Sequence, residues 1–267
     1  MEIIKNIFVV VPASAEYQPT IQYAIRMAQD LDARLIIALV YTCNVELEGK
    51  EPQDEVSLSH QKEYVKETFE QLKAKQLAHT SLDYKLVSVD GPFWKAILAA
   101  APTYHPDLII TTAIQRLPLQ ELILQIPYHL LLVPIQTKYK PIHHLGLAFD
   151  ANLIQNIEPV LFVSQLAKTY RADIEVLEFG HVNAVLSISS NRANVELDFL
   201  LKDVVHRFHL GDSEKAVVEN IEHYIEEHPT DMLVMLACPQ VLAYNEKEKN
   251  TVKIATNASV PVLVLKN

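Results

Sequence analysis

The 267-residue chain is 49% hydrophobic and 21% charged, a normal globular balance, and its net charge of −10 disfavours a nucleic-acid partner, which needs a basic surface. Its five glycines lie too far apart for a GxGxxG or GxxxxGK phosphate loop, and its two cysteines cannot build a disulfide framework. Because the N-terminus lacks the features of a signal peptide and no apolar run reaches the ~20 residues of a membrane span, we expect a cytoplasmic protein without a membrane partner.

In the first half of the chain, near-continuous Val, Ile and Leu runs alternate with helical patterns. Uninterrupted apolar strands are typical of a parallel sheet that is covered on both faces. In chain order the sequence predicts strands from Asn6, Ala33, Leu108 and His129, and helices from Pro19, Ser59 and Gly91. Strands that alternate with helices in this way predict an α/β domain with right-handed crossovers.

The second half repeats the first. The segment "GPFWKAILAAAPTYHPDLIITTA" from Gly91 parallels "GDSEKAVVENIEHYIEEHPTDMLVMLA" from Gly211, and each contains Lys-Ala, a helical stretch, His-Pro, Asp and an apolar strand. The strand "ADIEVLEFG" parallels "ARLIIALVY", and "VPVLVL" ends the second half as "HLLLVP" ends the first. The repeat predicts two tandem Rossmann-like domains, residues 1–137 and 142–267, joined by a polar boundary near "QTKYKPIH".

With the repeat laid out, the chain resembles the universal stress protein family in its tandem form. The resemblance lies in "IFVVVPAS", "GPFWKAILAAA" and "PDLIITTA" in the first half, and in "GLAFDAN", "DMLVMLA" and "NTVKIATNASVPVLVL" in the second. It implies an adenine nucleotide alpha hydrolase-like fold and two domains related by a pseudo-two-fold axis whose final strands pair within the chain. A homodimer and a role in the stress response are further implications.

Nucleotide-binding members of that family carry Asp at the end of the first strand, and Gly-x-x-Gly with a later Gly-Ser/Thr pair after the fourth. In the first half the Asp position is Pro12, and the glycine positions are Thr112 and Gln115. About eight residues of the phosphate loop are also missing relative to the second half. We expect an ordinary strand-to-helix turn here; the alternative is a polar site for another anion at Thr111 and Thr112.

In the second half Asp150 occupies the carboxylate position. The glycine positions are Leu236 and Pro239, which offer a phosphate neither a donor nor space. Asn250 and Thr251 are expected to open the final helix near the Gly-Ser/Thr position. Two interpretations stay open: a residual site for ATP or AMP at Asp150 and Thr251, or plain turn and helix-capping roles.

The eleven histidines raise the question of a metal site. The pairs 143–144 and 206–209 face apart in a strand, and neither pair has Cys or a carboxylate at zinc-ligand spacing. His105 and His228 lie beside proline at predicted helix ends, where the helix dipole explains them. The sequence therefore predicts no metal site.

No catalytic residue is predicted either. Cys43 and Cys238 follow strands without a basic neighbour, so semi-buried residues are favoured over reactive thiols, and no GxSxG nucleophile elbow is present. Trp94 could mark a partner surface or pack on the sheet. We expect a non-enzymatic regulatory or binding protein with an unknown protein partner or small ligand. The alternatives are a nucleotide-binding protein with weak hydrolase activity in the second domain and a protein–protein interaction module.

Overall fold

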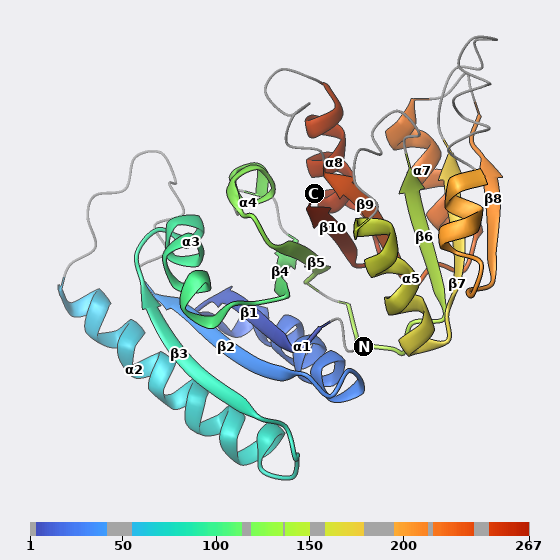
Figure 1. Cartoon of the computed structure of the whole chain (residues 1–267). Helices are drawn as coiled ribbons and strands as arrows, with labels where there is room; N and C mark the ends of the chain where they lie inside the picture. Colours follow the sequence, from blue (N-terminus) through green and yellow to red (C-terminus); the bar gives the residue numbers. More distant parts are fainter. Residues whose placement is uncertain are drawn as a thin grey trace. The chain divides into compact units, whose positions relative to one another are not determined.

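The computed structural model of the chain comprises two compact units, Met1–Tyr139 and Lys140–Asn267 (Figure 1). It describes residues 4–41, 55–113, 119–135, 137–149, 158–178, 195–212, 216–237 and 246–266. The features predicted at Cys43, Gln115, Asp150, Cys238 and Pro239 lie outside these residues. None of the described helices is long and apolar enough to cross a membrane.

The first unit contains five parallel strands in the order β3-β2-β1-β4-β5, with helices between them (Figure 1). The elements are β1 (Asn6–Pro12), α1 (Gln18–Asp30), β2 (Arg34–Tyr41), α2 (Glu55–Leu72), β3 (Tyr84–Asp90), α3 (Phe93–Tyr104), β4 (Leu108–Ala113), α4 (Leu119–Gln125) and β5 (His129–Pro134). A 3-10 turn, Ala15–Tyr17, precedes α1, and a π-helical turn, Lys73–Leu77, extends α2. The predicted α/β fold with an open parallel sheet is confirmed.

The second unit has the same strand order. Its elements are β6 (His144–Phe149), α5 (Glu158–Tyr170), β7 (Asp173–Glu178), β8 (His206–Leu210), α7 (Val217–Glu227), β9 (Met232–Ala237), α8 (Glu246–Asn257) and β10 (Val262–Lys266), with further helical residues at 195–200. The strands lie in the order β8-β7-β6-β9-β10, which repeats β3-β2-β1-β4-β5 element by element. This shared order is the structural counterpart of the sequence repeat.

The strands of each sheet are buried except for the edge strands β3 and β8 and polar residues of β7. Every residue of β4 is buried, and β1 is buried from Ile7 to its end, because helices cover both faces of the sheet. The edge strands β3 and β8 consist instead of exposed and half-buried residues, with no buried one. Polar side chains on β8, and on the neighbouring strand β7, are therefore partly accessible.

The helices α1 and α5 end in the same way. Asp32, two residues after the end of α1, and Arg171, directly after α5, have φ of 49° and 55°, in the left-handed region. The N–H of Ala33 bonds to the carbonyl of Ala28 at 2.9 Å, and the N–H of Ala172 bonds to that of Ala167 at 2.8 Å. Both ends are thus Schellman motifs, and both place a larger residue where glycine is usual. The repeat extends to the backbone geometry.

Candidate functional site

The carboxyl end of β1 in the first unit has neither a carboxylate at Pro12 nor an unused backbone N–H at Ala13 or Ser14. Pro12 is buried and has neither an N–H nor a carboxylate. The next two N–H groups are already used, since that of Ala13 donates to the carbonyl of Val40 and that of Ser14 to the carbonyl of Pro12, each at 2.8 Å. These two backbone N–H groups therefore already have hydrogen-bond partners within the first unit.

Thr111 and Thr112, at the end of β4, are both fully buried. The Thr111 hydroxyl donates to the carbonyl of Val10 at 2.7 Å, across the β1–β4 pair. The Thr112 hydroxyl has no hydrogen-bond partner among the residues that the structure describes. Because neither hydroxyl reaches solvent, the structure does not support the alternative of an anion site at these two residues.

The nucleotide positions of the second unit are only partly described. Asp150 lies outside the described residues, and β6 ends one residue before it, at Phe149. The prediction that Asn250 and Thr251 open the final helix is wrong, because α8 begins at Glu246 and Thr251 lies in its interior. Residues 246–249 are already helical, so Asn250 and Thr251 do not cap α8.

Helix α4 has 7 described residues and α8 has 12, and the residues that precede each of these helices lie outside the described part of the chain. That the first unit lacks about eight residues of the phosphate loop therefore stays a prediction.

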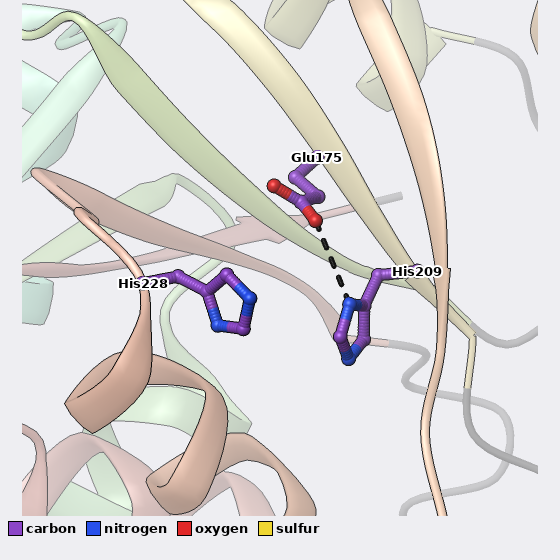
Figure 2. A group of neighbouring side chains, drawn as sticks. All are labelled: Glu175, His209 and His228. Carbon is purple, nitrogen blue, oxygen red and sulfur yellow. Dashed lines mark ion pairs between the residues drawn. The ribbon is translucent and has the colours of Figure 1, made fainter.

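A group of ionisable side chains gathers in the second unit, where α7 ends beside strands β7 and β8. Glu175 comes from β7, His209 from β8, and His228 directly follows α7 (Figure 2). One ligand atom from each residue lies within 4.8 Å of those of the other two. We call these three residues the histidine–glutamate cluster. All three are half-buried, so their polar atoms remain within reach of solvent.

Strand register places Glu175 and His209 on the same face of the sheet. In the parallel β7–β8 pair, Leu177 lies opposite His209 and Glu175 lies opposite Arg207. Because side chains alternate along a strand, Glu175, Leu177 and His209 share one face. The Nδ1 atom of His209 lies 3.5 Å from Oε1 of Glu175, the contact drawn in Figure 2.

The orientation of His228 is set by the last turn of α7. Its Nδ1 lies 3.2 Å from the carbonyl oxygen of Tyr224. Because a carbonyl can only accept, Nδ1 carries the proton in this hydrogen bond and Nε2 presents a lone pair. In Figure 2 one ring nitrogen of His228 faces His209 and the other faces away. In its neutral form, His228 therefore presents Nε2 as the ring atom that can bind a metal ion.

Tyr224 supports the cluster from the helix side. Its ring stacks on His228 with the centroids 4.5 Å apart and the planes at 12°, and His209 meets the same tyrosine ring edge-on at 5.1 Å. Tyr224 is 4% exposed. Burial, followed by the charge of Glu175 and a hydrogen bond with it, raises the pKa of the Tyr224 hydroxyl, so the phenol stays neutral. The three aromatic rings therefore hold one another in place.

Two surface hollows meet at the cluster. One, of about 260 Å³, is lined by Glu175, Tyr224 and His228 together with His144, Asp173 and Arg207. The other, of about 300 Å³, is lined by His209, Tyr224 and His228 together with residues of the β8–α7 connection. In the first hollow Asp173 has partners of its own, His144 at 2.6 Å and Arg207 at 3.6 Å. The hollows give a small solute or ion access to the cluster.

This arrangement was not predicted, because His209 was compared with its strand neighbour His206. His206 lies on the other face of β8 and bonds to Asp198 at 3.0 Å and to the carbonyl of Val204 at 2.9 Å. The expectation that His228 ends a helix was confirmed, since it caps α7. The cluster depends on the β7–β8 register, which brings Glu175 to the face of His209 and which sequence spacing does not contain.

Comparison with known proteins agrees with the fold. The sequence model of the Universal stress protein family matches residues 4–126. A universal stress protein from Archaeoglobus fulgidus DSM 4304 superposes with a TM-score of 0.68 at 12% identity, over 97% of this chain and 96% of that one. A putative universal stress protein from Pseudomonas aeruginosa UCBPP-PA14 gives 0.63 at 14% identity, over 98% and 93%. No curated protein matches the chain in sequence. The chain therefore has the fold of universal stress proteins over nearly its whole length, and residues 4–126 carry the sequence pattern of that family.

Proposed function

We propose that the chain is a tandem universal stress protein-like regulatory or binding protein that does not hold ATP in the way usual for that family. The family match over residues 4–126 and the repeated strand order of the second unit support two such domains, 1–137 and 142–267. A regulatory or binding role requires a ligand or a protein partner rather than a catalytic residue.

One observation carries the proposal: after β1 in the first unit, the backbone N–H groups of Ala13 and Ser14 already have hydrogen-bond partners within the protein. Pro12 replaces the carboxylate that would accept hydrogen bonds from a nucleotide, and the N–H groups of Ala13 and Ser14 are bonded within the protein. A phosphate or ribose there would have to break these bonds, and each backbone hydrogen bond contributes about 1 kcal/mol net. In the second unit the sequence places Leu236 and Pro239 at the glycine positions, which also disfavours a phosphate.

The proposal is tested by titrating the full chain with ATP, ADP and AMP in the presence of Mg²⁺, by calorimetry and by thermal unfolding. A nucleotide with a Kd of about 100 μM would stabilise the protein by about 1–2 kcal/mol at millimolar concentration. We expect no such gain. A gain in the wild type that is lost in Asp150→Ala, and retained in the surface control Asp203→Ala, would contradict the proposal. Asp203 is an exposed carboxylate paired with Lys168 in the same unit.

A further inference from the structure

We propose that Glu175, His209 and His228 bind a late first-row divalent cation, with Zn²⁺ preferred, and leave its fourth coordination position open to water or a small ligand. This site is separate from the nucleotide positions, since it is built from β7, β8 and the end of α7. It stands whether or not either unit binds a nucleotide.

The donor set selects the metal. Two imidazole nitrogens and one carboxylate oxygen suit Zn²⁺, Cu²⁺, Ni²⁺ and Fe²⁺, whereas Mg²⁺ and Ca²⁺ prefer oxygen ligands throughout. Zinc held by three protein ligands keeps a fourth position for an exchangeable group, while structural zinc sites use four. The partial exposure of all three side chains is consistent with such an open position.

The spacing of the ligand atoms fits a single ion. A tetrahedral zinc ion with bonds of about 2.0–2.1 Å holds its ligand atoms about 3.3 Å apart. The 3.5 Å between Nδ1 of His209 and Oε1 of Glu175 is close to that separation, and it is longer than a good hydrogen bond of about 2.7–3.2 Å. The third ligand atom, from His228, lies within 4.8 Å of both. Rotation of the partly exposed side chains of the cluster is sufficient to bring the three ligand atoms to the separation that a zinc ion needs.

The residues around the cluster match those that usually support a metal site. A histidine ligand commonly donates its second ring N–H to a carbonyl or carboxylate, which fixes its tautomer and orientation. His228 does this with the carbonyl of Tyr224. The Tyr224 side chain in turn stacks on His228 and hydrogen-bonds Glu175.

Calorimetric titration of the metal-free full chain with ZnCl₂ tests the proposal. We expect one equivalent of Zn²⁺ to bind with a Kd of about 1 μM or tighter. His209→Ala and His228→Gln should each weaken binding more than about 100-fold, and Tyr224→Phe, which removes only a supporting hydroxyl, by about 10-fold. The control His206→Ala changes a histidine of the same strand that faces away from the cluster, and it should leave the Kd unchanged.

Folding of each variant is checked by circular dichroism in EDTA, and a second measurement needs only the wild type. In histidine ¹⁵N spectra, Zn²⁺ should shift one nitrogen of His209 and Nε2 of His228, and should leave both nitrogens of His206 unchanged. If the wild type binds Zn²⁺ no tighter than about 100 μM, the site does not exist as proposed. Equal loss of binding in His206→Ala, or zinc shifts at other histidines alone, would also overturn it.

Discussion

The carboxylate of Asp231 lies 2.9 Å from the backbone nitrogen of His144 and holds the first residue of β6 in place. The same oxygen accepts the N–H of His143 at 2.8 Å, and the other oxygen lies 2.6 Å from Nζ of Lys140. The Asp231 side chain is only 9% exposed. One aspartate, in the turn before β9, thus anchors the start of the neighbouring strand.

Asp107 makes the same contact in the first unit. Its Oδ2 accepts the N–H groups of Lys5 and Asn6 at 2.8 and 2.9 Å, at the start of β1. Both aspartates follow the His-Pro pair of the sequence repeat, Asp107 directly and Asp231 after Thr230. The two aspartates of the pattern are therefore structural anchors between the first and fourth strands of each unit.

Asp231→Asn should lower the free energy of unfolding by about 1.5–3 kcal/mol at neutral pH, the range for hydrogen bonds to a charged group. Burial by itself raises the pKa of Asp231, but the hydrogen bonds from Lys140 and from the N–H groups of His143 and His144 bring it below the ordinary 3.8. A carboxyl whose pKa is lower in the folded state stabilises the protein above pH 3.8 and loses that contribution as the pH falls through its folded value.

Urea unfolding between about pH 7 and pH 2 checks this prediction. The difference between wild type and Asp231→Asn should be constant above about pH 5 and should shrink at the acid end. A difference of the same size at both ends of the range would mean that the charge of Asp231 is not what stabilises the fold.

Thr111 and Thr112 should respond in opposite ways to substitution by valine. Thr111→Val removes a buried hydrogen bond to Val10 and leaves that carbonyl with one acceptor site unused, at a cost of about 1–2 kcal/mol. Thr112→Val removes a buried hydroxyl that has no partner among the described residues, so stability should stay the same or rise by up to about 1 kcal/mol. Denaturant unfolding of the two nearly isosteric variants compares them directly. A larger loss in Thr112→Val would indicate that its hydroxyl binds something that matters to the fold.

Gly146 in β6 provides a test of how Tyr224 packs beside the cluster. A Cβ at this position would lie 3.6 Å from Cε1 of Tyr224 and 3.4 and 3.6 Å from the side chains of Leu233 and Leu177, which are ordinary contacts. Gly146→Ala should therefore be neutral or stabilise the strand by about 0.5–1 kcal/mol. Gly146→Val adds two methyl groups to the same space and should cost about 1–3 kcal/mol through overpacking. Thermal unfolding measures both; similar stabilities for Ala and Val would show that Tyr224 does not cover this position.

Zinc should stabilise the second unit by mass action. At a free Zn²⁺ concentration 100 times the Kd, the gain in unfolding free energy is about 2.7 kcal/mol. Differential scanning calorimetry should show this gain in wild type and in His206→Ala, its removal by EDTA, and its absence in His209→Ala. Stabilisation of equal size in His209→Ala would assign the effect to other zinc-binding groups.

Much of the fold follows from local sequence signals. Apolar runs without alternation predicted buried parallel strands, and Pro19 marked the start of α1, where it is the second helical residue. The residues around Thr251 did not predict the start of the final helix correctly. Asn and Thr favour helix caps in isolation, but Glu246 and its neighbours are also good helix formers, and α8 extends over them.

The histidine–glutamate cluster could not be predicted in the same way. Glu175 and His209 are neighbours only through the register of β7 on β8, and sequence spacing does not contain that register. His228 joins them because α7 packs its Tyr224 face beside Gly146 of the sheet, which is a tertiary contact. The sequence placed His209 in a strand and His228 at a helix end correctly, yet it could not indicate that they meet.

The most direct measurement is a crystal structure of the full chain soaked with Zn²⁺, with anomalous diffraction recorded on both sides of the zinc absorption edge. The account predicts one anomalous peak about 2.0–2.2 Å from a nitrogen of His209, Nε2 of His228 and an oxygen of Glu175, with a non-protein ligand in the fourth position. A peak elsewhere, with none among these three side chains, would contradict it.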